Sequence, residues 1–317
     1  MGVLRVAVAA LAVALALAPG AQAASVIQID PDGGGAQGTI SVGSLDWNVG
    51  NALIQTIEAK TSQDYGQSNL ANFNNSAAQP ITGTGLSTNY EWTYVLGVNS
   101  AVSQTLPVTI LTPTTGGENF FKIYYDASKN SNALAGTGYA DGTVILTGHF
   151  SLIGLQTFTA GAGNGHVDIN LDGIDDITLQ PIPLDQFGTN NYPTINSVVG
   201  AGGGSLQVIV DSFDPAFFLT PPSVISLNFN TANTLNYTET DPSALFTTAG
   251  GTTAGATAGS IGSCNGCINE TAPNVMLQVD ASTSFDVAAV PLPGALMLVG
   301  AGVSVLAGLA AVRRRRA

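Results

Sequence analysis

The chain has 317 residues, of which 45% are hydrophobic and 9% are charged, and this apolar content excludes an intrinsically disordered chain. All 21 acidic residues lie between Asp30 and Asp286, where Lys60, Lys122 and Lys129 are the only basic residues, so this region carries a formal net charge of −18. A field of that sign repels nucleic acid and anionic lipid, so neither is an expected partner, and it favours cations or cation-bridged polysaccharide.

The first 23 residues are typical of a secretory signal peptide. Arg5 precedes an apolar run from Val6 to Ala18, Pro19-Gly20 breaks that run, and Ala21-Gln22-Ala23 is a small-x-small cleavage site. The alternative is a retained N-terminal anchor, for which the apolar run is short. The sequence therefore predicts export, with residues 1–23 removed.

Residues 24–289 are predicted to form a β-rich extracellular domain. Apolar and polar residues alternate most clearly over Val224–Asn230, and clusters of Gly, Asn, Asp and Pro separate such segments. Further predicted strands are Glu91–Val98, Phe121–Tyr125, Thr143–Phe150, Leu155–Thr159, Ile177–Gln180, Leu206–Val210 and Val275–Val279. We therefore expect an all-β fold, an antiparallel β-sandwich-like domain between the signal peptide and a single C-terminal transmembrane helix.

Two polar stretches are predicted to lie outside the strands. Asp64–Ser87 is rich in Asn, Gln, Ser and Gly, which favours a long surface loop. Ala249–Ser263 consists almost wholly of Gly, Ala, Thr and Ser, a composition typical of a mobile linker.

An Asp-rich segment from Asp168 to Asp176 is the strongest candidate for chemistry. It fits the pattern D-x-N-x-D-G-x-x-D, and a calcium loop needs oxygen ligands at alternating positions and a Gly at the sixth. The predicted Ca²⁺ ligands are Asp168, Asn170, Asp172, the backbone carbonyl of Ile174, and Asp176. Because the twelfth position is Leu179 and no helices flank the loop, it is not an EF-hand. The alternative is a polar turn with Asp-Gly at its tip.

The two cysteines, Cys264 and Cys267, enclose an Asn-Gly pair. With no further cysteine a zinc tetrad is excluded, and in an exported chain the pair predicts a local disulfide that closes a tight turn.

Catalysis and sugar stacking have weaker signals. His166 lies beside the Asp-rich loop, where a general base is conceivable, but no G-x-S-x-G motif is present, so we do not expect an enzyme. Six aromatic residues near polar ones are candidates either for a sugar platform or for core packing: Trp47, Tyr65, Tyr90, Trp92, Tyr192 and Tyr237.

The C-terminal residues 290–317 have three parts in a fixed order. The motif Val290, Pro291, Leu292 and Pro293 is followed by a charge-free apolar run from Gly294 to Val312. A run of this length is sufficient to cross a bilayer. Arg313, Arg314, Arg315 and Arg316 then hold the distal end on the cytoplasmic side. The alternative is a plain single-span anchor that is never processed.

This tripartite pattern resembles the bacterial PEP-CTERM sorting signal. The family motif has Pro-Glu-Pro where this chain has Pro291-Leu292-Pro293, which matches the Val-Pro-Leu-Pro variant class. The resemblance implies a membrane contact through the C-terminal span, processing by an exosortase-type membrane protease as partner, and release to the cell surface or matrix.

The central region resembles the flocculation-associated PEP-CTERM proteins. The segments that carry the resemblance are Phe121–Asp126, Leu134–Gly142, Leu184–Gly188 and Asp214–Phe218. It implies a cell-surface or matrix protein that supports flocculation or biofilm through association with exopolysaccharide, directly or through Ca²⁺. The alternatives are a secreted carbohydrate-active enzyme or carbohydrate-binding module, and a passive coat protein without a specific ligand.

Overall fold

The computed structural model describes residues 25–58, 60–163, 165–186, 189–232, 245–250, 256–257, 261–268 and 274–286. This part of the chain is all-β, and its centre is one large antiparallel sheet. The sheet contains ten strands: β3 (Ser44–Trp47), β4 (Gly50–Glu58), β5 (Thr61–Asn74), β6 (Glu91–Thr105), β7 (Val108–Pro113), β8 (Phe120–Asp126), β9 (Thr143–Ala160), β14 (Gly200–Phe213), β15 (Val224–Ala232) and β19 (Val275–Asp286).

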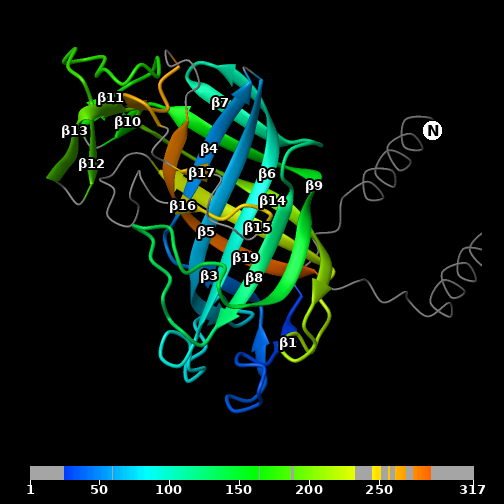
Figure 1. Ribbon diagram of the computed structural model, residues 1–317. Coiled ribbons are helices and arrows are strands. Elements are labelled where there is room, and N and C mark those ends of the chain that lie inside the picture. Colours follow the sequence, from blue (N-terminus) through cyan, green and yellow to red (C-terminus); the bar gives the residue numbers. More distant parts are fainter. Residues whose placement is uncertain are drawn as a thin grey trace, which may run out of the picture.

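The large sheet closes on itself, as Figure 1 shows. β5 pairs with β6, while β7 and β8 both join β6 to β9 at different heights. β9 continues through β14 and β15 to β19, and β3 and β4 both join β19 back to β5. The prediction of an all-β antiparallel fold is confirmed, and its opposing faces belong to a single sheet that surrounds one interior.

Shorter strands form small sheets around this ring: β1 (Ile27–Ile29) with β2 (Ile40–Val42), β10 (Ala162–Gly163) with β11 (His166–Val167), β12 (Pro183–Gln186) with β13 (Thr189–Ser197) and β18 (Cys264–Asn265), and β16 (Leu245–Phe246) with β17 (Ala256–Thr257). Figure 1 shows β10–β13 gathered at one end of the closed sheet and β1 at the other end.

The interior is filled by side chains that point inward at every second position. On β15 the buried residues Ile225 and Leu227 alternate with Ser226 and Asn228, as the sequence predicts. Large aromatic side chains fill the centre, where Trp47 meets Tyr94 edge to face with ring centroids 4.8 Å apart. Such pairs add about 0.5–1.5 kcal/mol to the burial of their apolar area.

A second apolar cluster lies on the outer face of β4, β5, β6 and β19. Leu53, Tyr65 and Met276 sit opposite one another on neighbouring strands and are buried. Segments outside the ring cover them, and polar side chains of the strands hold those segments by hydrogen bonds. The Gln67 amide donates to the Leu245 carbonyl at 2.7 Å, and the Thr93 hydroxyl donates to the Tyr139 carbonyl at 2.7 Å.

The structure corrects three sequence predictions. Asp64–Ser87 is not one long loop, because its first part, up to Asn74, belongs to β5. The polar composition of this segment favoured a loop over a strand in the sequence analysis. In the structure these polar side chains lie in a strand whose two faces are both covered. Thr143–Phe150 and Leu155–Thr159 are one continuous strand, β9. Ile177–Gln180 is a turn, because the Asp175 carboxylate accepts hydrogen bonds from the backbone N–H groups of the turn.

Candidate functional site

A polar groove of about 480 Å³ crosses the outer face of the closed sheet. Its lining comes from five strands, β3, β9, β14, β15 and β19, and its side chains point outward from neighbouring positions of the ladder. Asn230 lies opposite Asp280, Ser282 lies opposite both Asn228 and Asp46, and Thr157 lies opposite Gly203. We call this hollow the outer groove, and its full lining is Asp46, Thr157, Gly202–Gly204, Asn228–Asn230 and Asp280–Ser282.

Glycine makes the floor of the outer groove. Gly202, Gly203 and Gly204 line it, so β14 contributes no side chain there. A Cβ added at Gly203 would lie 2.7 Å from the Phe229 carbonyl oxygen and 3.1 Å from Asn230 Oδ1. The hollow therefore depends on a run of glycines that lets the flanking strands approach closely.

Two carboxylates give the outer groove its charge. Burial raises the pKa of the Asp280 carboxyl, and the nearby charge of Asp46 raises it further. Asp46 is itself held by Asn72, whose Nδ2 donates to Asp46 Oδ2 at 3.4 Å. The repulsion between two like charges means that a hydrogen-bond donor or a cation is favoured at this place.

The arrangement suits recognition of hydroxyl groups. Carboxylate oxygens accept hydrogen bonds, the two asparagine amides both donate and accept, and Ser282 and Thr157 supply hydroxyls. No motif reveals this site, because its residues are far apart in the chain. The available signals are the Gly202–Gly204 run and the outward alternation of Asn228 and Asn230.

The predicted calcium residues lie together in one tight loop. Their carboxylate oxygens accept hydrogen bonds from backbone N–H groups of the same loop. The buried Asp168 carboxylate accepts the backbone N–H of Gly173 at 3.1 Å and that of Asp172 at 3.3 Å. Asp172 Oδ1 accepts Ile174 N–H at 2.9 Å, and Asp176 Oδ2 accepts Ile169 N–H at 2.7 Å. These bonds account for the shape of the loop without an ion.

Within the ranges that the structure describes, no group of three or more His, Cys, Asp or Glu residues is placed to hold a metal ion. The Asn170 amide donates to Asp172 Oδ2 at 3.0 Å, and the Ile174 side chain is exposed. Ca²⁺ binding by this loop therefore stays a prediction.

Cys264 and Cys267 form the predicted disulfide, and the Asp-rich loop packs on it. A Cβ at Gly173 would lie 2.7 Å from Cys264 Sγ and 2.8 Å from Cys267 Sγ. The backbone N–H of Ile268 donates to the Leu171 carbonyl at 3.0 Å. The disulfide turn therefore serves as the platform on which the Asp-rich loop rests.

His166 pairs with a residue that the sequence did not single out. Its Nδ1 lies 3.0 Å from Asp175 Oδ2. Hydrogen bonds from the backbone of Thr178 and Ile177, together with His166, outweigh burial and lower the pKa of Asp175 to about 2. A carboxylate that is held ionised and caps a turn has a structural use, so this pair gives no support to catalysis.

Four of the six aromatic candidates for a sugar platform have described side chains, and all four pack inside the protein. Trp47, Tyr65, Tyr90 and Trp92 are all buried. The Trp92 indole N–H donates to the Pro31 carbonyl at 2.9 Å, and the Tyr90 hydroxyl donates to the Thr84 carbonyl at 2.7 Å. The Tyr192 side chain and Tyr237 lie outside the described residues.

The predicted targeting segments also fall outside the described residues. They are the signal peptide of residues 1–23, the motif from Val290 to Pro293, the apolar run after it, and Arg313 to Arg316. In the part of the chain that is described, no helix has the length and apolar character to span a membrane.

Compared with family models, with curated proteins and with solved structures, the chain has no match.

Proposed function

We propose that this is an exported cell-surface or matrix protein that associates with exopolysaccharide through the outer groove. The observation that carries the proposal is the groove itself, a polar hollow of about 480 Å³ on the outer face of the closed sheet. Its Asp, Asn, Ser and Thr side chains alternate donors and acceptors, as the hydroxyl groups along a sugar chain also do.

The charge of the protein restricts the kind of polysaccharide. With a formal net charge of −18 over the region from Asp30 to Asp286, an anionic polymer would be repelled unless cations bridge the two. Asp46 and Asp280 place two of those charges inside the groove. The proposed ligand is therefore a neutral glycan, or an acidic glycan with divalent cations between the two surfaces.

Delivery to that location rests on the two ends of the sequence. The signal peptide of residues 1–23 supports export, and the Val290–Pro293 motif with its apolar run and arginine tail supports sorting. In this proposal an exosortase-type membrane protease removes the tail, and the mature protein then has no span of its own. An intact mass of the matrix-associated protein that lacks both ends would support this route. A protein that is found in membranes alone, with a mass that still includes Arg313–Arg316, would contradict this route.

Ca²⁺ at the Asp-rich loop is an additional part of the proposal. Asp176 is exposed and Asp172 is partly exposed, and extracellular calcium modules bind with a Kd of roughly 10⁻⁴–10⁻³ M. In a calcium titration monitored by NMR, the amide resonances of Asp172 and Asp176 should then shift selectively. Flocculation and folding that are both unchanged by a chelator would remove calcium from the proposal.

The groove is tested by retention of the purified protein on isolated matrix polysaccharide. Replacing Asn228 and Asn230 together by alanine removes two donor–acceptor side chains and should weaken retention about tenfold or more. Gln104→Ala is the matched control, because Gln104 is an exposed amide on β6 that does not line the groove. Equal retention of both variants would contradict the groove assignment, and release of soluble sugar would favour the carbohydrate-active enzyme instead.

A further inference from the structure

The interior of the closed sheet contains a cavity of about 50 Å³ that is separate from the outer groove. Most of its wall is apolar, formed by inward side chains such as Leu206, Leu227, Leu277 and Val279. Phe229 and Ala281 line both the cavity and the groove, so the cavity lies directly behind the groove wall. Around the ring, β3 and β4 share one position and β7 and β8 share another, so the ten strands fill about eight positions. A closed sheet of about eight strands has an interior just wide enough for packed side chains or for one small ligand.

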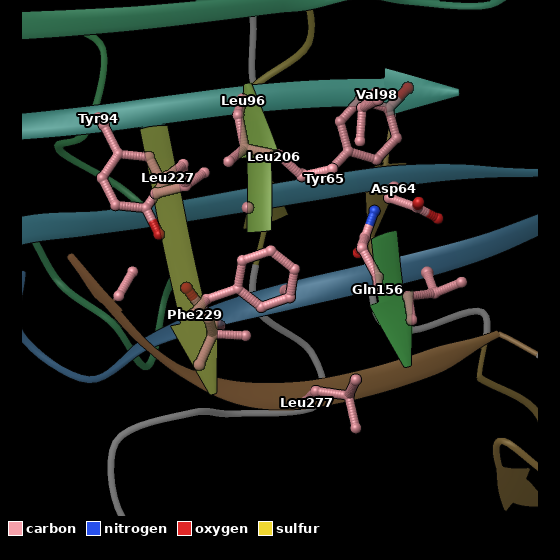
Figure 2. A pocket seen from close by; sticks show the side chains of 16 residues that line it. Asp64, Tyr65, Tyr94, Leu96, Val98, Gln156, Leu206, Leu227, Phe229 and Leu277 are labelled. Carbon is pink, nitrogen blue, oxygen red and sulfur yellow. The ribbon is translucent and has the colours of Figure 1, made fainter. Parts of the chain in front are cut away.

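One end of the cavity is polar, as Figure 2 shows, with Asp64 and Gln156 pointing toward one another. Both side chains are buried, at 5% and 9% exposure. Asp64 accepts the hydroxyl of Ser62 at 2.7 Å on one oxygen and the hydroxyl of Ser100 at 2.6 Å on the other. A carboxylate has about four lone-pair positions, so each Asp64 oxygen can accept a further hydrogen bond.

Gln156 places a buried amide donor at the same end of the cavity. Its Nε2 is buried and lies near enough to Asp64 to lower the pKa of that carboxyl, yet it forms no hydrogen bond of good geometry with any described residue. A buried unpaired donor costs about 1–3 kcal/mol, so such groups usually have a partner that the protein itself does not provide. The polar end therefore presents one donor without a well-formed hydrogen bond beside acceptor positions of Asp64, and the rest of the wall presents hydrocarbon.

We infer that this cavity binds a small neutral molecule with a short aliphatic body and one hydroxyl group, that is, a short-chain alcohol. A hydroxyl accepts from Gln156 Nε2 and donates to Asp64, which satisfies both groups with one ligand atom. A carboxylic acid anion is disfavoured because Asp64 would repel it. The aliphatic part would contact Leu206, Leu227 and Leu277.

Size limits the ligand further. An apolar cavity of roughly 150 Å³ holds benzene, whereas one water needs roughly 10–15 Å³. A cavity of about 50 Å³ therefore admits a few heavy atoms and no large cargo. This inference does not depend on polysaccharide association, because the cavity and the groove lie on opposite faces of the sheet.

The test is titration of the purified full-length protein with a homologous series of alcohols from methanol to 1-pentanol, followed by amide NMR. We expect saturable shifts confined to the cavity strands, with the affinity rising along the series and then falling when the chain no longer fits. Butyrate, with the same body and a negative charge, should not bind. Gln156→Leu should weaken alcohol binding about tenfold, because the donor is lost.

A second variant guards against misfolding of the first. Ala52→Val adds two methyl groups to the cavity wall while Gln156 and Asp64 stay in place, and it should abolish binding. Gln104→Ala on the outside of the ring should bind as the unchanged protein does. Shifts that rise linearly without saturation, binding that Gln156→Leu leaves unchanged, or a cavity that holds water alone would each overturn the inference.

Discussion

The side chain of Asn265 pairs with the backbone of Met276 as a neighbouring strand would. Asn265 Nδ2 donates to the Met276 carbonyl at 3.1 Å, and Asn265 Oδ1 accepts Met276 N–H at 2.7 Å. Met276 lies at the part of β19 that pairs with β4 on one side but precedes the residues paired with β15 on the other. One buried side chain thus completes the hydrogen bonding of the sheet and attaches the disulfide turn to it.

Replacing Asn265 by alanine should therefore destabilise the fold strongly. The change removes two buried hydrogen bonds to the Met276 backbone, at a cost on the order of 2–4 kcal/mol. Urea unfolding of the two proteins would give the difference. Asn48→Ala, at an exposed position, should stay within about 0.5 kcal/mol of the original. A similarly small effect at Asn265 would show that this pairing contributes little.

Loss of the disulfide should loosen the Asp-rich loop more than the sheet. Replacing Cys264 and Cys267 by serine removes the platform under Gly173. Because the bridge closes a short turn, we expect a modest loss of about 1–3 kcal/mol. Hydrogen exchange should become faster at the N–H groups of Gly173 and Ile268 and remain slow in β14. Exchange that is unchanged at Gly173 would contradict the platform role.

Stability should fall as the pH rises from about 4 to about 7 because of Asp64. Burial raises the pKa of this carboxyl from 3.8 to about 6, against side-chain hydrogen bonds from Ser100, Ser62 and Gln156 that lower it. The folded state therefore binds the proton more tightly than the unfolded state. The stabilisation is fully present below pH 3.8 and is lost as the pH passes through about 6. The difference amounts to about 3 kcal/mol.

Asp64→Asn isolates this effect, since the variant cannot ionise at that position. The free energy of unfolding, measured by urea at pH 4, 5, 6 and 7, should fall for the original protein relative to Asp64→Asn across this window. Parallel curves for the two proteins would mean that Asp64 does not titrate there. Asp175, whose pKa is lowered to about 2, affects stability at lower pH and is common to both proteins.

The two carboxylates of the outer groove should be coupled. Because the charge of Asp46 raises the pKa of Asp280, Asp46→Asn should lower that pKa. Carboxyl-carbon NMR titration of Asp280 in the two proteins measures the change. Asp126→Asn, a carboxylate on β8 that does not line the groove, should leave the titration of Asp280 unchanged. An Asp280 pKa unaffected by Asp46→Asn would show that the two charges act independently.

The sequence alone was sufficient for the strands with regular alternation. Ile225 and Leu227 face the interior and Ser226 and Asn228 face outward because a strand sends neighbouring side chains to opposite sides. The disulfide was equally local, since two cysteines three positions apart have no other partner in the chain. β5 escaped prediction because its buried polar side chains bond to groups from other segments: Asp64 accepts from Ser100, and the Gln67 amide donates to the Leu245 carbonyl.

The candidate sites were decided by tertiary structure. Alternation along one strand specifies which side chains share a face, but it does not specify which strands become neighbours. The outer groove joins Asp46 to Asp280, and the cavity joins Asp64 to Gln156, through pairings between residues far apart in the chain. A sequence pattern therefore predicts the all-β class and the local turns, whereas the register of a closed sheet decides which polar groups meet.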